Sequence, residues 1–206
     1  MTPAMKPISD HLNALVKRVP AWPLYILCMG HVFWLFYQGL NGALGPEPIK
    51  ALEHAYGEAG LKVLIAVLAV TPLRKYVGLN LLKFRRALGL SAFIYILSHL
   101  LVWLVLDLGN VALIWADIVK RPYITVGMVG FALLLPLAAT SNNASIRRLG
   151  ATRWRKLHKL TYLAAILGAA HFIMLVKGIQ IEPLVFMAVI LGLIGTRFWA
   201  RLAKTA

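Results

Sequence analysis

The sequence predicts an all-α integral membrane protein, with six transmembrane helices in one bundle and both termini in the cytoplasm. Three observations predict this class. Hydrophobic residues make up 60% of the 206 residues and charged residues only 14%, whereas soluble domains have about 45–50% and about 25%. Uncharged segments recur at lengths close to those that cross a bilayer. Basic residues gather in alternate connections between these segments.

A membrane-spanning helix needs about 20 mainly apolar residues. In chain order, uncharged segments support the first span within residues 21–45, the third within 87–106, the fourth within 122–146 and the fifth within 160–176. The second and sixth contain Lys62 and Arg197, whose long side chains can carry the charge to the interface. The expected spans are residues 21–42, 56–73, 87–107, 122–141, 158–176 and 183–200. Because the loops between them are short, residues 1–206 are expected to form a single domain.

The basic residues predict the orientation of the bundle. Seventeen Lys and Arg residues, with one acidic residue, lie in the N-terminal segment, the second and fourth loops and the C-terminal segment. The opposite side carries five basic and six acidic residues. This asymmetry follows the positive-inside rule and predicts cytoplasmic termini. We therefore interpret the net charge of +15 as a topology signal and expect no nucleic-acid partner.

Several function classes lack the motif that they require. A single cysteine, Cys28, excludes a disulfide within the chain, and without a C-x-x-C-H motif there is no covalent attachment of c-type haem. The sequence also lacks the H-E-x-x-H, G-x-G-x-x-G and P-loop motifs. No Asp or Glu lies in the middle of an expected span, which disfavours a proton-coupled carrier.

Histidines lie deep in the expected spans, with His31, His99 and His171 inside and His54 and His158 near helix ends. His99 and His171 lie toward the outer ends of the third and fifth spans, which run in the same direction, so we expect similar depths. Two imidazoles at one level of a bundle can hold a haem iron from opposite faces. A pair of hydrogen-bonded core histidines, or histidines that line a polar cavity, is the alternative. For His31 and His54, packing or capping is the expected role.

His158 and Arg85 are further candidates for cofactor contacts. His158 precedes His171 by 13 residues, which leaves the two about 140° apart on a straight helix, so a second bis-histidine haem is not supported. Two interpretations stay open for His158: a cofactor ligand with another partner, or an interfacial histidine. Arg85 is a candidate contact for an anion such as a haem propionate, a flavin phosphate or a lipid head group.

Beyond these single residues, the chain resembles the MsrQ (YedZ) family of the ferric-reductase-like transmembrane superfamily. MsrQ proteins are haem-binding membrane subunits of a bacterial periplasmic methionine sulfoxide reductase system. The resemblance rests on Arg85-Arg86-Ala-Leu-Gly89-Leu, Tyr95, His99-Leu, Arg121-Pro122-Tyr123-Ile-Thr125-Val-Gly127, Thr140-Ser141, Leu149-Gly150, Trp154, Leu157-His158, Tyr162 and His171.

The resemblance implies a function and a set of cofactors. In the superfamily, the third and fifth spans usually carry two histidines each and hold two b-type haems. Here Arg85 or Arg86 stands in place of the first histidine, which leaves His99 and His171 as the implied iron ligands. The resemblance further implies electrons from the quinone pool, FMN as a further cofactor, and delivery to a periplasmic molybdopterin-containing reductase.

We therefore expect a multi-pass protein of the bacterial inner membrane that transfers electrons through b-type haem and is not itself the catalytic subunit. Two other classes fit the sequence. One is a small transporter with a histidine-lined pathway, and the other is a membrane scaffold for a partner enzyme. A reducible haem absorption band would distinguish the first interpretation from both alternatives.

Overall fold

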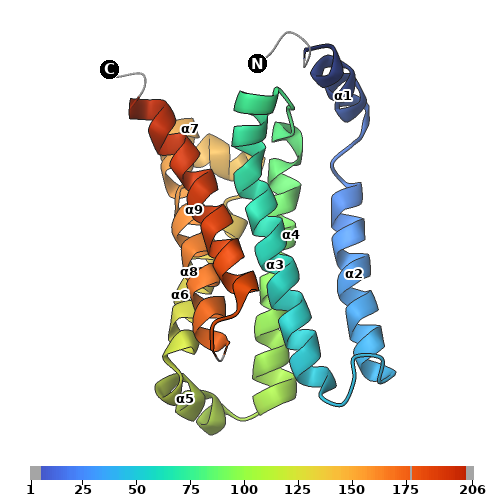
Figure 1. Cartoon of the computed structure of the whole chain (residues 1–206), viewed down its shortest axis with the longest axis vertical. Coiled ribbons are helices and arrows are strands. Elements are labelled where there is room, and N and C mark those ends of the chain that lie inside the picture. Colours follow the sequence, from blue (N-terminus) through green and yellow to red (C-terminus); the bar gives the residue numbers. More distant parts are fainter. Residues whose placement is uncertain (1–5, 177, 203–206) are drawn as a thin grey trace.

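The computed structural model describes residues 6–176 and 178–202, and within this part of the chain all regular structure is helical (Figure 1). The α-helices are α1 (Lys6–Arg18), α2 (Pro23–Leu40), α3 (Pro48–Pro72), α4 (Arg85–Leu101), α5 (Val111–Lys120), α6 (Pro122–Ala139), α7 (Asn143–Leu157), α8 (Leu160–Leu175) and α9 (Ile181–Leu202). Short π-helical turns extend α3 over Leu73–Val77 and α4 over Val102–Leu108, and a 3-10 turn, Leu82–Phe84, precedes α4.

The lengths and composition of these helices confirm a multi-pass membrane protein. Three helical segments, Pro48–Val77, Leu82–Leu108 and Pro122–Ala139, are long and apolar enough to cross a membrane. The number rises to five if two bent pairs each count as one span. One pair joins α1 to α2 at 77°, and the other joins α7 to α8 at 43°. Six spans and the cytoplasmic position of the termini stay predictions.

The second expected span, residues 56–73, corresponds to α3. This helix begins earlier than expected, at Pro48. Proline is favoured in the first turn of a helix, where its fixed φ fits and no N–H is needed. Two exposed ion pairs lie along this segment, Lys50 with the N-cap residue Glu47 and Lys62 with Glu58. The longer helix brings residues near its start into the bundle.

The central core lies between α3, α4, α8 and α9. Ala92, Ala165 and Ala169 are each fully buried there, and their small side chains let the helices approach closely. The closest helix pairs are α3 with α4 and α6 with α8. Arg197 of α9 is accommodated because its guanidinium donates to the Leu68 carbonyl at 2.8 Å and to the Tyr162 hydroxyl.

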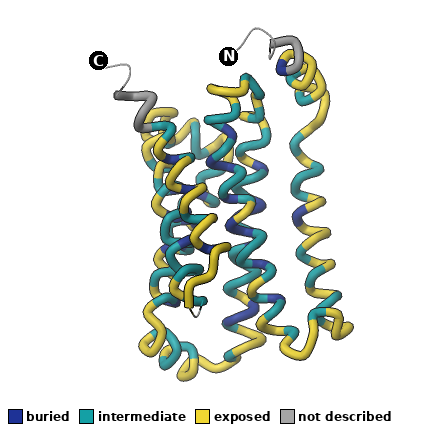
Figure 2. Tube along the Cα trace, viewed as in Figure 1, coloured by how far each residue is buried: buried dark blue, intermediate teal, exposed yellow. Residues whose placement is uncertain are grey.

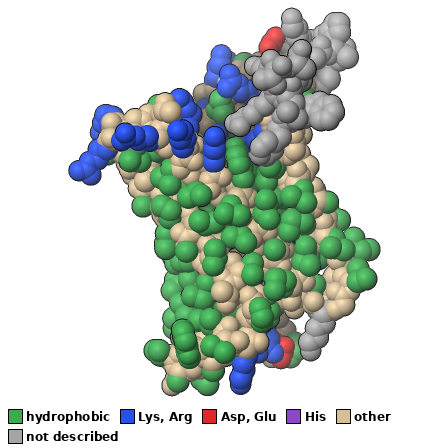
Figure 3. Space-filling view, turned by 90° about the vertical axis from the view of Figure 1, so that its left-hand side faces the viewer, with side chains coloured by type: hydrophobic (Ala, Val, Ile, Leu, Met, Phe, Trp, Pro, Cys, Tyr) green, Lys and Arg blue, Asp and Glu red, His purple; other side chains and the backbone are tan. Residues whose placement is uncertain are grey.

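The surface of the bundle is apolar around its middle. Figure 2 shows exposed residues along most of α2, among them Leu27 at 67% and Phe33 at 64% exposure. In Figure 3, hydrophobic side chains form a broad band, and Lys and Arg side chains gather at the end of the molecule where the termini lie. This distribution is the one that a bilayer around the middle of the bundle would favour.

The side of the membrane on which the basic end lies can be tested with reporter fusions. Fusions after Lys75 and Lys156 should report a cytoplasmic location, because both positions lie in basic connections. Fusions at Asp117 and Gln180 should report the opposite side. Alkaline phosphatase and green fluorescent protein activities, measured for the same positions, provide the readout. An inverted pattern would overturn the orientation.

Candidate functional site

His99 and His171 each dock on the backbone of a neighbouring helix. His99 projects from α4, and its Nδ1 lies 2.9 Å from the Glu53 carbonyl oxygen of α3. His171 projects from α8, and its Nδ1 lies 2.8 Å from the Tyr123 carbonyl oxygen of α6. A carbonyl oxygen can only accept, so Nδ1 donates in both hydrogen bonds. Each Nε2 therefore keeps its lone pair and is available as a ligand atom.

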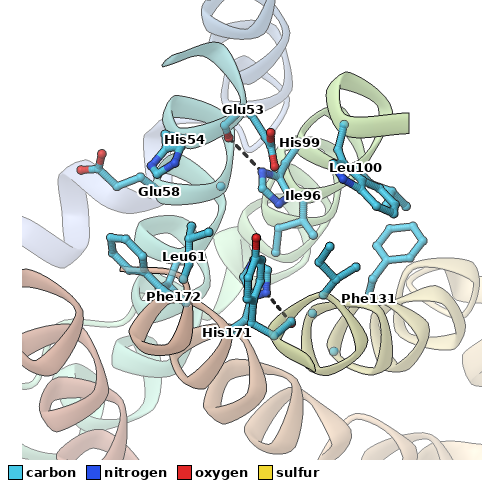
Figure 4. Close-up of a pocket in the computed structure, with 18 of the residues that line it drawn as sticks. Glu53, His54, Glu58, Leu61, Ile96, His99, Leu100, Phe131, His171 and Phe172 are labelled. Atoms are coloured by element: carbon cyan, nitrogen blue, oxygen red, sulfur yellow. Dashed lines mark hydrogen bonds between the residues drawn. The ribbon is translucent and has the colours of Figure 1, made fainter. Parts of the chain in front are cut away.

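The structure brings the two imidazoles together. Their ring centroids lie 6.0 Å apart, and their planes are inclined at 81°. Figure 4 shows the two side chains entering the same pocket from different helices, with both backbone hydrogen bonds drawn. A cavity of ≈ 490 Å³ surrounds them, within the range of small-molecule and cofactor pockets.

The cavity has an apolar interior and a charged opening. Its apolar lining includes Leu61, Ile96 and Phe131 (Figure 4). Gly168 also lines it, where an added Cβ would meet only Leu61 at 3.5 Å. The ionisable lining lies toward the end of the bundle opposite the termini and comprises Lys50, Glu53, His54, Glu58, Asp107, Arg121 and Glu182.

Arg121 is the cation at this opening with the most defined contacts. It pairs with Asp117 at 3.0 Å, and its Nη1 donates to the Tyr123 hydroxyl at 3.2 Å. The contact with Tyr123 raises the pKa of Arg121, and the carboxylates of Asp117 and Asp107 raise it further. Arg121 therefore stays cationic in the backbone turn that leads into α6.

The comparisons with known proteins give the family of this chain. Residues 56–169 match the family described as ferric reductase like transmembrane component. Proteins named protein-methionine-sulfoxide reductase heme-binding subunit MsrQ from Brucella ovis, Brucella canis and Brucella suis are each 49% identical over 174 residues. That alignment covers 84% of this chain and 79% of each relative. The chain belongs to the MsrQ family. No solved structure matches it.

Family membership confirms the resemblance that the sequence motifs predicted. The MsrQ-family motif from Arg121 to Gly127 now has a structural setting, because it supplies the Tyr123 carbonyl that receives His171. His99 lies inside the segment that matches the transmembrane family, and His171 lies two residues beyond its end.

His158 lies away from the cavity in this MsrQ-family chain. It follows the last residue of α7, and its Nε2 is 3.1 Å from the Thr140 hydroxyl. Its ring stacks on Trp154 with centroids 3.8 Å apart. The fifth expected span corresponds to α8, which begins at Leu160 rather than at residue 158. Because α7 and α8 meet at an angle of 43°, His158 and His171 do not share one straight helix. The straight-helix estimate of their angle therefore does not apply.

Arg85 also does not line the cavity. It begins α4 and is partly buried, with Arg197 and Tyr162 as electrostatic neighbours. The 14 residues between Arg85 and His99 correspond to a rise of about 21 Å along the helix. This separation disfavours a contact between Arg85 and the propionates of a haem held by His99 and His171.

His31 and His54 differ in how they relate to the cavity. His31 lies on the exposed side of α2, and its Nδ1 is 2.9 Å from the Tyr95 hydroxyl, in keeping with a packing role. His54 lines the opening of the cavity together with Glu53. Sequence reasoning missed Glu53 and His54 as site residues because it placed the start of the second span at residue 56. Pro48 in a helix-initiating position was the signal for the earlier start.

Proposed function

We propose that this protein binds b-type haem between His99 and His171 and carries electrons through the membrane to a periplasmic methionine sulfoxide reductase. The two imidazoles that face each other across one cavity are the observation that carries the proposal. Family membership supports it, because the relatives are named heme-binding subunits of a protein-methionine-sulfoxide reductase. The protein is then a redox subunit, and the reduction of the sulfoxide belongs to its partner.

The geometry of the histidine pair fits such a group. A histidine nitrogen binds a transition metal at about 2.0 Å, and the ring centre lies about 1.1 Å further back, so two opposed ligands place their ring centres about 6 Å apart. The observed centroid separation is 6.0 Å. The free Nε2 of each ring, the cavity of ≈ 490 Å³ and the bare backbone at Gly168 also suit a flat macrocycle.

The residues of this protein would hold the haem, orient it and enclose it. Bound haem would supply one-electron redox chemistry, which protein side chains do not provide. His99 and His171 would hold the haem iron through Nε2, and the Glu53 and Tyr123 carbonyls fix which nitrogen of each ring is free. Leu61, Ile96 and the other apolar lining residues exclude water from the interior. Arg121 and Lys50 lie at the opening, where their positive charges would attract the propionate carboxylates of the haem.

The donor and acceptor follow from the family and from the position of the cavity. We propose the quinone pool as the electron donor and a molybdopterin-containing reductase in the periplasm as the acceptor. The cavity opens at the end of the bundle opposite the termini, which is the outer end if the basic end is cytoplasmic. Docking of the reductase is expected to be small in area and transient, as electron-transfer encounters usually are. The inner membrane of the bacterium is the proposed location.

The basic end of the bundle is the proposed place for a second group. FMN is the further cofactor that the family resemblance implies. Arg85 is proposed as a contact for its phosphate or for a lipid head group, because Arg85 is partly buried near a second cation, Arg197. His158 is proposed as an interfacial histidine or as a ligand of a cofactor at that end. The acceptor that it already contacts, the Thr140 hydroxyl, favours the interfacial role.

Cofactor analysis of the purified protein tests the proposal. After expression with full haem supply, we expect at least one b-type haem per polypeptide. Its Soret absorption band should shift when a quinol reduces the iron. Flavin released from the same sample measures FMN. A colourless protein would contradict the haem proposal and favour a transporter or a scaffold. Transport assays in vesicles and capture of the reductase would then separate those two classes.

A further inference from the structure

Each of the two histidine rings lies directly against a glycine of the neighbouring helix. A Cβ added at Gly57 of α3 would lie 3.1 Å from His99 Nδ1. A Cβ added at Gly127 of α6 would lie 2.7 Å from His171 Nδ1, closer than real Cβ contacts come. Any side chain at Gly127 would therefore have to displace the ring.

These glycines stand four residues after the carbonyl groups that accept from the histidines. Glu53 precedes Gly57, and Tyr123 precedes Gly127, by the same interval. In an α-helix the carbonyl of one residue points at the N–H of the residue four positions later. A donor from another helix can reach that carbonyl only if the later residue leaves room for it. Glycine leaves this room because it has no Cβ.

The arrangement occurs twice, on different helix pairs. One copy joins α3 to α4, and the other joins α6 to α8. Glycine in a helix interior is normally unfavourable relative to alanine, so a packing reason is expected for it. Some helical glycines, such as Gly89, have no atom within 4 Å of an added Cβ, and others, such as Gly60, meet aliphatic atoms instead. Close contact with an imidazole is thus specific to Gly57 and Gly127 among the glycines of the described residues.

We propose that Gly57 and Gly127 are positioning residues for the two iron ligands. They admit each Nδ1–H to a backbone carbonyl and hold the two ring planes nearly perpendicular, at 81°. The inference rests on the proposed binding of haem by His99 and His171. Donation from Nδ1 makes the opposite nitrogen a more basic ligand, which stabilises the ferric state and lowers the reduction potential. Perpendicular imidazole planes give low-spin ferric haem a strongly anisotropic EPR signal, whereas parallel planes give a rhombic one.

The experiment compares four alanine variants of the full-length, haem-loaded protein. Gly127→Ala and Gly57→Ala place a methyl group against His171 and His99. Gly89→Ala is the open control on α4, with no neighbour to displace. Gly60→Ala is the packing control, because its methyl group would lie 2.6 Å from Ile96 Cγ1 and would touch no histidine. Haem per polypeptide, the low-temperature EPR spectrum, the midpoint potential and the melting temperature are measured for each.

We expect Gly127→Ala to weaken haem retention by about 10–100-fold, the range found when an outer-shell partner of a metal ligand is lost. Gly57→Ala has the milder contact and should keep haem, with a smaller EPR anisotropy and a raised potential. Gly89→Ala should match the unmodified protein. Gly60→Ala should lower the melting temperature, while the haem that it retains keeps the original EPR signal.

Two results would overturn the inference. One is an unchanged EPR signal and potential in Gly57→Ala and Gly127→Ala at full haem occupancy. The other is an equal change in Gly60→Ala, which would assign the effect to the spacing of α3 and α4. Both results leave haem binding by the unmodified protein intact, so they are distinct from failure of the proposed function. If Gly127→Ala does not accumulate, Gly57→Ala decides alone.

Discussion

Replacing His171 with alanine should remove almost all haem from the protein, and His99→Ala should do the same. Each imidazole would supply one of the two proposed bonds to the iron, and His99 and His171 are the pair whose rings the structure brings to 6.0 Å. Loss of an outer-shell partner of a metal ligand lowers metal affinity by about 10–100-fold. Haem affinity should fall by more than this when the histidine itself is removed. The reduced-minus-oxidised absorption spectrum and the haem content per polypeptide measure it.

Two other histidines provide matched controls for this result. His31→Ala removes a hydrogen bond with the Tyr95 hydroxyl on the exposed side of α2, which corresponds to about 1 kcal/mol of stability. It should leave the haem spectrum unchanged. His158→Ala should also keep this haem, although electron entry from the basic end is expected to slow. If His158→Ala abolished haem binding while His171→Ala retained it, the assignment of the ligands would be wrong.

Haem reduced through the quinol pool should be reoxidised when the periplasmic reductase and methionine sulfoxide are added. The outer position of the cavity favours electron exit on that side, provided that the basic end is cytoplasmic. In membranes that contain the unmodified protein, the rate should rise with sulfoxide concentration until the reductase is saturated. In membranes that contain His171→Ala, quinol-dependent sulfoxide reduction should fall to the background rate. Stopped-flow absorbance and product analysis provide the readouts.

The direction of transfer has its own control. A soluble acceptor offered only at the cytoplasmic face of sealed vesicles should not replace the reductase. Haem that stays reduced with a competent reductase, yet is drained by the cytoplasmic acceptor, would show that electrons leave at the opposite face. Omitting methionine sulfoxide should stop turnover after the reductase has taken up its own electrons.

Much of the fold could be predicted because lipid excludes charge. The lengths of uncharged segments located α2, α4, α6 and α8 to within a few residues. They did not predict α5 and α7, which lie in segments expected to be loops. Both begin after an asparagine whose side chain accepts backbone N–H groups: Asn110 from Ala112 at 2.8 Å and Asn142 from Ser145 at 2.8 Å. These caps are local signals that a count of charges does not contain.

The proximity of His99 and His171 could be predicted from the sequence, but their hydrogen-bond partners could not. The distances of His99 and His171 from the charged ends of their segments indicated similar depths, and the structure brings the rings together. Their hydrogen-bond partners lie 46 and 48 residues away in the sequence and are main-chain atoms. No residue type identifies such a partner, so the contact becomes visible only when α3 and α6 are placed beside the histidines.

The choice of main-chain acceptors has a consequence for how this site tolerates mutation. Side-chain replacement at Glu53 or Tyr123 leaves the carbonyl oxygen in place, so an alanine scan would not remove either hydrogen bond to the two imidazoles. The same holds during sequence divergence. Substitutions at positions 53 and 123 would keep these two hydrogen-bond acceptors as long as α3 and α6 keep their course, although the Tyr123 ring also lies 5.7 Å from the His171 ring. The hydrogen bonds that orient the two imidazoles are therefore inherited through the course of two helices, and they do not depend on which side chains the accepting residues carry.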